Sequence, residues 1–518
     1  MLGISRVLPF LAWIGLTMGL YTEVYRPQFH FSPAENWMND PCGLFYHEGL
    51  YHLYFQYNPG GITWGNMSWG HATSEDLSHW EEHPVALLAE GYPGNVTEMY
   101  YTGSAVVDTN NTSGFGTNGE TPIIAVYTSQ YEMTQTLPSG EEVLWDQESQ
   151  SIAYSLDNGK TWKTYDAGNP VIEYPPSPYR DQYENFRDPF VFWHADSEKW
   201  VLVTSLAEIN RLVIWTSDNL KDWSVASEFG PVNAVGGVWE CPNLFPLPVD
   251  GSETNQKWVL IVGLNPGGPP GTVGSGDQYF IGDFNGTAFI PDSDSIYSAN
   301  TTSNWLDWGP DYYASSAYNG LSAKHHVQLG WMNNWQYGES IPTYPWRSAM
   351  AAPRRLSLKT IDGKTYSWKS FETGMQSVGS IGKTLDINLS FSGVKENGSN
   401  KGEFGIIVHA TSNLTQQTRI GYDFEEGTMF VDRRKSGDVA FDETFPRKYF
   451  APSRSESDGS INLRILVDWS SVEVFNGAST LTAQVFPSED ATYGHIFSTE
   501  GSTQNVSLKI SEVSSIWT

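Results

Sequence analysis

Three acidic residues precede proline in the same sequence setting. Asp40 and Asp188 are followed directly by proline, Glu240 is followed by Cys-Pro, and each unit leads into two short runs rich in aromatic and β-branched residues. Carboxyl groups that meet in one site can cleave an acetal, because one protonates the leaving oxygen while another attacks the carbon. A single Asp-Pro is an ordinary turn dipeptide, but three copies in the same register predict one shared site.

The segments around these acids repeat as a structural unit. Short strand-like runs lie between turn residues, and segments 73–80, 155–162 and 216–223 share a hydroxyl residue, a turn and a final Trp. Four-stranded units repeated in this way are arranged radially in β-propellers, whose first strands line a central channel. Acids at the start of three first strands would therefore face the same channel.

The remaining regions have different patterns. Arg6 followed by an apolar run is typical of a secretory signal, and the alternating runs after Leu385 predict an antiparallel β-sandwich. We therefore expect an all-β protein. The predicted regions are a signal peptide at 1–20, a catalytic β-propeller at 21–355, a linker at 356–384 and a β-sandwich at 385–518.

The composition favours a secreted protein with a neutral ligand. With 29 Lys+Arg against 59 Asp+Glu the formal net charge is −30, which opposes binding to nucleic acid or to an anionic membrane. Aromatic residues make up 14% of the chain, and flat apolar side chains suit sugar rings. We expect an extracellular glycoprotein with N-linked glycans. The acceptor sequences are at Asn66, Asn95, Asn110, Asn111, Asn285, Asn300, Asn388, Asn397, Asn413 and Asn505.

Four histidines invite a metal-site interpretation. His47, His52, His71 and His79 lie within one short region, but their spacings fit no usual zinc pattern. We therefore expect neither a metal nor a cofactor.

The chain has two cysteines, Cys42 and Cys241. An even count in a secreted protein suggests a disulfide, but the channel would hold strands of non-adjacent blades too far apart for a bridge. Because side chains alternate along a strand, Cys42 should share the orientation of Asp40 and shape the pocket. By the same argument Cys241 should point away from Glu240 into the blade.

Six segments resemble the signature segments of glycoside hydrolase family 32. They occur in the family's order, and the fungal exo-inulinases are the most similar members. The resemblance implies a five-bladed β-propeller followed by a β-sandwich, and the release of terminal fructose from inulin, levan or sucrose. The segments are 37–43 (WMNDPCG), 55–59 (FQYNP), 64–71 (WGNMSWGH), 186–189 (FRDP), 239–242 (WECP) and 468–475 (DWSSVEVF).

The resemblance also implies a role for each acid. Asp40 would be the nucleophile on fructose C2, and Glu240 the acid and then the base of a retaining double displacement. Asp188 would hold the fructose 3- and 4-hydroxyls, with Arg187 fixing its orientation and helping to keep it ionised. Further contacts to the terminal fructose are implied for Asn39, Gln56, Trp64, Thr102 and Trp335.

Two alternatives remain open at this point. Cys42 stands where the family motif usually has Asn, a replacement associated with some fungal fructosyltransferases, so the chain could instead make oligosaccharides from sucrose. A non-catalytic fructan-binding protein is the other alternative. It would be favoured if one of the three acids were missing, and all three are present.

Overall fold

The computed structural model describes residues 21–299, 302–358, 370–371, 374–393, 401–477, 479–500 and 503–517. The predicted signal peptide lies outside these residues. Within them the elements are β-strands and short 3₁₀ helices, as the strand-rich sequence predicts. No helix in this part of the chain is both long and apolar enough to span a bilayer.

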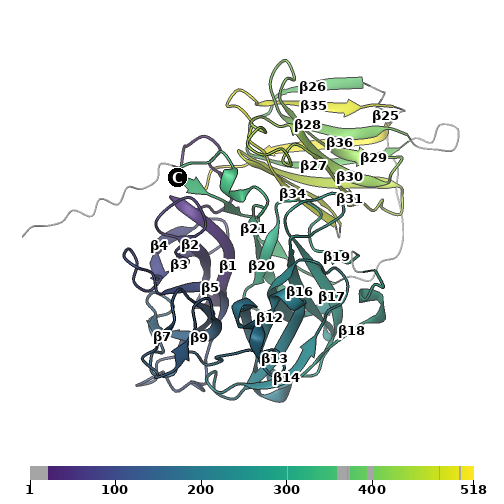
Figure 1. The fold of residues 1–518 in the computed structure, drawn as a ribbon. Helices are drawn as coiled ribbons and strands as arrows, with labels where there is room; N and C mark the ends of the chain where they lie inside the picture. Colours follow the sequence, from purple (N-terminus) through teal and green to yellow (C-terminus); the bar gives the residue numbers. More distant parts are fainter. Residues whose placement is uncertain are drawn as a thin grey trace, which may run out of the picture.

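Five antiparallel sheets form the blades of a β-propeller (Figure 1). Listed by blade, the main strands are β1 (Asn36–His47), β2 (Leu50–Asn58), β3 (Ser68–Ser74) and β4 (Glu81–Leu87); β5 (Glu98–Val107), β6 (Ile123–Tyr131), β9 (Glu148–Ser155) and β10 (Lys163–Thr164); β11 (Phe186–His194), β12 (Lys199–Leu206), β13 (Arg211–Ser217) and β14 (Ser224–Phe229); β15 (Val238–Val249), β16 (Ser252–Asn265), β17 (Gly276–Phe284) and β18 (Phe289–Pro291); β20 (Tyr313–Ala317), β21 (Val327–Met332) and β23 (Ala349–Met350).

Smaller elements complete the propeller. They are the hairpin of β7 (Gln135–Thr136) and β8 (Glu142–Val143), the short strands β19 (Asn304–Trp305), β22 (Trp346–Arg347) and β24 (Arg354–Arg355), and the 3₁₀ helices η1 (Arg180–Asn185), η2 (Ala195–Ser197), η3 (Ala207–Ile209), η4 (Ser293–Ser295), η5 (Ala323–His325) and η6 (Gly338–Ser340). Strand β22, which lies between β21 and β23 of the fifth blade in the chain, pairs in parallel with β1 of the first. This pairing joins the last blade to the first.

The innermost strands β1, β5, β11, β15 and β20 contact one another in a closed ring around the propeller axis. Asn319 crosses the axis beyond β20. Its Nδ2 donates to the carbonyl oxygens of Ala105 at 2.9 Å and Val191 at 3.0 Å, and its backbone amide donates to Leu44 O at 3.0 Å. One residue therefore ties three inner strands together.

Each of the five inner strands has a register shift against the second strand of its own blade. The shifts fall between Met38 and Pro41 on β1, and the corresponding intervals on the other four strands are Tyr100/Gly103, Arg187/Phe190, Glu240/Asn243 and Tyr313/Ser316. Such β-bulges re-aim side chains and are frequent next to active sites. In this protein they encircle one end of the axis.

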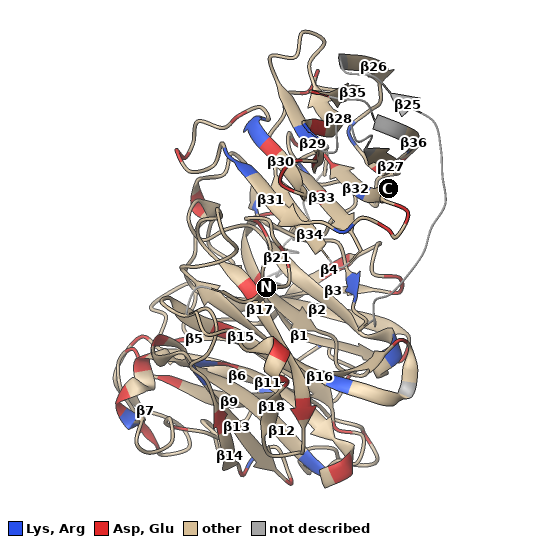
Figure 2. Cartoon of the chain, turned by 90° about the vertical axis from the view of Figure 1, so that its right-hand side faces the viewer, with Lys and Arg blue, Asp and Glu red and all other residues tan. Residues whose placement is uncertain are grey.

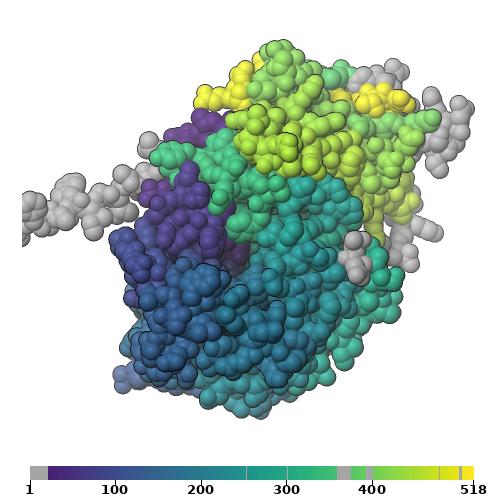
Figure 3. Space-filling view, viewed as in Figure 1, coloured from purple at the N-terminus to yellow at the C-terminus, as the bar shows by residue number. Residues whose placement is uncertain are grey.

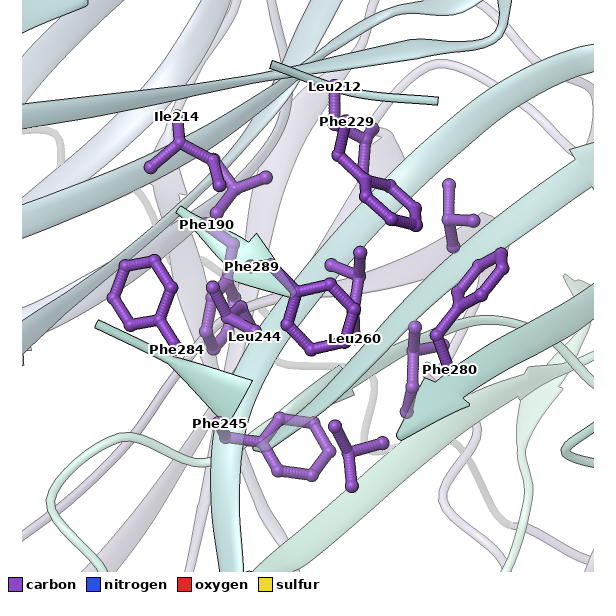
Figure 4. Packing of buried hydrophobic residues seen from close by; sticks show 14 of the residues in the cluster. Phe190, Leu212, Ile214, Phe229, Leu244, Phe245, Leu260, Phe280, Phe284 and Phe289 are labelled. Carbon is purple, nitrogen blue, oxygen red and sulfur yellow. The ribbon is translucent and has the colours of Figure 1, made fainter. Parts of the chain in front are cut away.

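Apolar side chains fill the spaces between blades. Figure 4 shows the cluster between the third and fourth blades, where Phe190 and Ile214 face Phe245 and Phe284. The faces of neighbouring blades are both apolar, so each blade buries one face against the next. This packing fixes the relative positions of the inner strands, and hence of the side chains that they carry.

Two six-stranded sheets form the β-sandwich at the C-terminal end of the chain. The first contains β25 (Ser370–Phe371), β27 (Leu385–Gly393), β32 (Ser460–Asp468), β33 (Ser471–Asn476), β34 (Ser479–Gln484) and β36 (Thr503–Glu512). The second contains β26 (Gly374–Ser380), β28 (Glu403–Ala410), β29 (Gln417–Asp423), β30 (Thr428–Lys435), β31 (Lys448–Pro452) and β35 (Tyr493–Ser498).

The sandwich begins earlier than the sequence pattern predicts. Strand β26 lies inside the predicted linker at 356–384, yet it pairs with β35 as an edge strand of the second sheet. An edge strand has one unpaired side and little buried surface, and Met375 on β26 is 52% exposed. Its residues therefore lack the alternation by which the other sandwich strands were predicted.

The sandwich packs directly on the propeller (Figure 3). At this interface His30 bridges two buried acids of the sandwich, with Nδ1 2.8 Å from Asp468 Oδ2 and Nε2 2.8 Å from Glu473 Oε1. Arg354 Nη2 donates to Glu473 Oε2 at 2.9 Å. A second buried pair joins Arg433 of the sandwich to Asp311 of the propeller at 2.6 Å.

Acidic residues lie on both units, and Figure 2 shows Lys and Arg scattered among them. The strong negative charge therefore has no basic counterpart of the kind that phosphate-rich partners need.

We predict that the His30 bridge gives the protein a stability maximum between about pH 4.5 and 6.5. Burial alone would lower the pKa of His30, but hydrogen bonds to Asp468 and Glu473 raise it from 6.5 to about 9. Burial alone would raise the pKa of Glu473, but His30 and Arg354 lower it from 4.5 to about 2. The His30 contribution is thus lost as the pH rises through 9, and that of Glu473 as the pH falls towards 2.

Unfolding temperatures measured from pH 3 to 10 test this. His30→Gln should flatten the alkaline side of the profile, whereas His79→Gln, which changes an exposed histidine paired with Asp76, should leave it unchanged. Identical alkaline profiles for the native protein and His30→Gln would contradict the prediction.

Candidate active site

The irregular segments of three inner strands bring the predicted acids together. Asp40 lies on β1, Asp188 on β11 and Glu240 on β15, each within or at the edge of the interval where its strand loses register. Cys241 connects them. Its amide donates to Asp188 Oδ2 at 2.9 Å, and its sulfur lies 3.5 Å from Asp40 Oδ2 and 3.7 Å from Asp188 Oδ2. The acid-proline repeats therefore mark residues that meet in space.

Asp40 is a buried carboxyl group held through both oxygens. Thr102 Oγ1 donates to Oδ2 at 2.7 Å and Asn39 Nδ2 donates to Oδ1 at 3.0 Å. Trp37 Nε1 in turn donates to Asn39 Oδ1 at 2.8 Å. Burial raises the pKa of Asp40, while the hydrogen bonds from Thr102 and Asn39 act in the opposite direction. Thr102 and Asn39 thus orient the carboxyl group.

Glu240 is less buried than the other two acids. Tyr313 Oη donates to its Oε2 at 2.7 Å, and Arg187 Nη2 donates to its Oε1 at 3.2 Å. Burial raises the pKa of Tyr313 well above its usual value, so the phenol stays protonated and remains a donor. Both carboxyl oxygens of Glu240 are therefore fixed, on a side chain that solvent reaches.

The position of Arg187 differs from the prediction. We expected its guanidinium to orient Asp188, but its Nη1 donates to Glu148 Oε1 at 3.2 Å and to Asn185 Oδ1 at 3.1 Å, while Nη2 contacts Glu240. Asp188 has a left-handed backbone with φ of 61°. Burial raises the pKa of Asp188 well above its usual range, although the charge of Arg187 opposes this.

The remaining predicted residues lie around the same end of the axis. Gln56 is buried and its Nε2 donates to Tyr100 O at 3.0 Å, close to Thr102 on β5. Trp64 is 39% exposed. Its ring stands edge-on to Tyr101 at 5.9 Å between centroids. Trp335 packs on Trp37 and Trp331, in the cluster that also contains Cys241.

Both cysteines are reduced and buried, as predicted, but their orientations are the reverse of the prediction. Cys42 packs between blades with Phe45, Tyr54 and Trp69, whereas Cys241 points at the acids. Strict alternation does not apply here because bulges interrupt both strands, and Cys241 has φ of 49°. Burial raises the pKa of Cys241 well above its usual value, with the charges of Asp188 and Asp40 adding to the effect.

The histidines near the first blade form a stack. His52 Nδ1 lies 3.2 Å from His71 Nε2, and the two rings stack with Tyr54. Burial lowers the pKa of His52 to about 4 and that of His71 to about 2. Among the described residues no group of three or more His, Cys, Asp and Glu side chains is arranged to hold a metal ion.

Two family models match the amino-acid sequence. The model of the glycosyl hydrolases family 32 N-terminal domain matches residues 30–369, and that of the family 32 C-terminal domain matches residues 357–512. The chain belongs to glycosyl hydrolases family 32. This family 32 protein is therefore a glycosidase, with the five-bladed propeller and β-sandwich that the sequence resemblance implies.

Individual relatives agree with the family assignment. The extracellular exo-inulinase of Aspergillus ficuum is 59% identical over an alignment of 520 positions, which covers 96% of each chain. The levanase of Bacillus subtilis is 42% identical over 96% of this chain and 72% of its own. The crystal structure of the exo-inulinase from Aspergillus awamori superposes with a TM-score of 0.92 at 57% identity and covers 96% of this chain and 100% of its own.

Sequence reasoning missed three residues of this family 32 site. Tyr313 and Glu148 contact Glu240 and Arg187 from other blades, and nothing in their local sequence marks them. Cys241 follows Glu240 in one of the signature segments, and this position could have predicted its contact with the acids. Burial raises the pKa of Glu148 to about 7, although the charge of Arg187 lowers it in part.

We expect Asp40→Ala and Glu240→Ala each to lower kcat by at least about 10³-fold, since general acid catalysis alone contributes about 10² to 10⁴. Steady-state kinetics measure this loss, and the unfolding temperature checks the fold. Asp218→Ala, which changes a surface acid paired with Lys199, is the control. A tenth of native turnover in either active-site variant would contradict the assignment.

Glu148→Gln should lower kcat about 10- to 100-fold without unfolding the protein, because it releases Arg187 from its anchor beside Glu240. The titration of Glu148 near pH 7 should appear as an inflection in the native pH–rate profile and be absent from that of the variant. Glu142→Gln, on the exposed side of β8, is the control. A Glu148→Gln profile that keeps the inflection would show that another group titrates there.

Proposed function

We propose that the protein is an exo-acting fructan β-fructosidase, which releases terminal fructose from inulin, levan and sucrose. The observation that carries the proposal is the pair of a buried Asp40 and a more accessible Glu240. Cys241, the residue after Glu240, brings the two strands together by placing its sulfur against Asp40. A retaining glycosidase needs this pair, with a nucleophile at the anomeric carbon and an acid that reaches the leaving oxygen. The extracellular exo-inulinases and the levanase among the relatives support fructans as the substrate class.

In the first step Asp40 attacks C2 of the terminal fructose, and Glu240 protonates the glycosidic oxygen as its bond to C2 breaks. The rest of the chain, or glucose from sucrose, leaves as an alcohol. In the second step Glu240 takes a proton from water, and the oxygen of that water attacks C2 and displaces Asp40. Fructose leaves with its anomeric configuration retained.

The neighbouring residues have supporting roles in this proposal. Thr102 and Asn39 hold the Asp40 carboxyl group in line with C2, and Tyr313 and Arg187 hold that of Glu240. Asp188, which has Cys241 N on one oxygen, binds the fructose 3- and 4-hydroxyls. Trp64, Trp335 and Gln56 form the walls around the terminal ring.

The proposal includes export and glycosylation. The apolar segment at 1–20 would direct secretion, and the extracellular relatives support this location. Of the acceptor asparagines, Asn110 and Asn285 lie exposed on the propeller surface, where a glycan meets no steric obstacle. Residues 21–355 would be the catalytic region.

Nothing about Cys42 favours the transferase alternative. Its thiol is buried between blades, with Gln56 Nε2 at 4.0 Å from the sulfur, so it does not line the side on which water or an acceptor sugar approaches. Hydrolysis is therefore the better proposal.

Chromatography of the products tests the proposal. We expect fructose alone from inulin at all times of the reaction, and equal amounts of glucose and fructose from sucrose. Mixed oligosaccharides from inulin would indicate endo-cleavage, and kestose as the main product from sucrose would indicate transfer. Asp40→Ala serves as the control for contaminating activity.

A further inference from the structure

A cavity of about 490 Å³ lies at the end of the propeller opposite the acids. The same inner strands reach both places, because β11 carries Asp188 near its start and Phe192 in the cavity wall, and β15 carries Glu240 and then Phe245. The lining includes Phe190 and Leu244, on the far side of the bulges, and none of the three acids or of the predicted fructose contacts. The cavity is therefore distinct from the catalytic end.

Asn319 stands between the two ends. Its hydrogen bonds to Ala105 and Val191 connect β5 and β11 across the axis, and it also lines the cavity. A ligand in the cavity thus contacts the far side of this bridge and does not reach the acids.

Aromatic side chains line the cavity from its mouth inward. Trp193 is 39% exposed and stands edge-on to Trp200 at 5.1 Å between centroids. Deeper in the wall, His326 stacks on Phe245 at 3.8 Å between centroids. Burial lowers the pKa of His326 to about 3, so its ring is neutral. Flat neutral surfaces of this kind suit an uncharged ring better than an ionic group.

Polar side chains that a ligand can reach lie at the rim of the cavity. Thr109, Asp196 and Gln256 line it and are exposed. Their hydroxyl, carboxyl and amide groups can exchange hydrogen bonds with the hydroxyl groups of a sugar.

We propose that this cavity is a second, non-catalytic sugar site, which binds fructofuranosyl units of a fructan chain. The choice of a fructan as the sugar rests on the proposed function. The volume falls within the range of about 300–1,000 Å³ of pockets that enclose a drug-sized ligand, so the cavity accommodates a short stretch of oligosaccharide. Binding there raises the concentration of long substrates at the protein, because a captured chain stays near the catalytic end.

Kinetics on substrates of two lengths test the proposal with the full-length protein. Trp193→Ala should raise KM for inulin at least about fivefold, as expected for the loss of one aromatic anchor, and leave kcat and KM for sucrose unchanged. Gln256→Ala removes one exposed amide from the rim, so it should keep the fold and raise KM for inulin by a smaller factor. Phe450→Ala, at an aromatic residue of the sandwich that is 40% exposed, should change neither value.

Direct binding gives a second readout. In calorimetry with nystose, the Asp40→Ala protein should bind two molecules, and the Asp40→Ala/Trp193→Ala protein should bind one. A single binding event in Asp40→Ala, or an unchanged KM for inulin in both Trp193→Ala and Gln256→Ala, would overturn the second site. Fructose release from sucrose by the native protein does not depend on the cavity. Its absence would contradict the proposed function, whereas the KM and binding results above test only the second site.

Discussion

The bulges on the five inner strands are the constraint on which the site depends. Regular strands would turn every second side chain away from the axis, and Glu240 and Cys241 could not both contact the catalytic cluster. The bulges remove this limit by giving Asp188, Cys241 and Ala314 left-handed φ values of 61°, 49° and 49°. Such conformations are unfavourable for residues other than glycine and persist only where the surroundings enforce them. The closed ring of strands and the apolar packing between blades enforce them here.

Buried charge is arranged in a similar way at the catalytic end and at the domain interface. At the catalytic end Arg187 lies between Glu148 and Glu240, and at the domain interface Arg354 and His30 lie around Glu473. In each case a cation compensates carboxyl groups that come from different strands. A buried charge without its partner is strongly destabilising, so these clusters fix how blades and domains meet. The sandwich thereby holds Arg354 at the end of the propeller chain.

Sequence reasoning identified the residues that stand in repeated local patterns. It did not identify features that depend on contacts between distant parts of the chain. Asp40, Asp188 and Glu240 could be found because each stands in the same local pattern, and the geometry of a propeller then requires them to converge. The partners of Arg187 could not be found, since Glu148 and Glu240 belong to other blades. The orientation of Cys241 was wrong because a bulge cannot be read from alternation. The start of the sandwich was placed too late because an exposed edge strand carries little hydrophobic pattern.

The Asn319 bridge has a consequence for the order of events in catalysis. It crosses the axis about 10 Å beyond the acids, since Ala105 and Val191 lie three residues past Thr102 and Asp188 on their strands. A fructose ring bound at the acids therefore has no rear exit and must depart by the route through which it arrived. The shortened polymer occupies that route until it diffuses away. In each cycle the shortened polymer therefore withdraws from the catalytic end before the fructose departs.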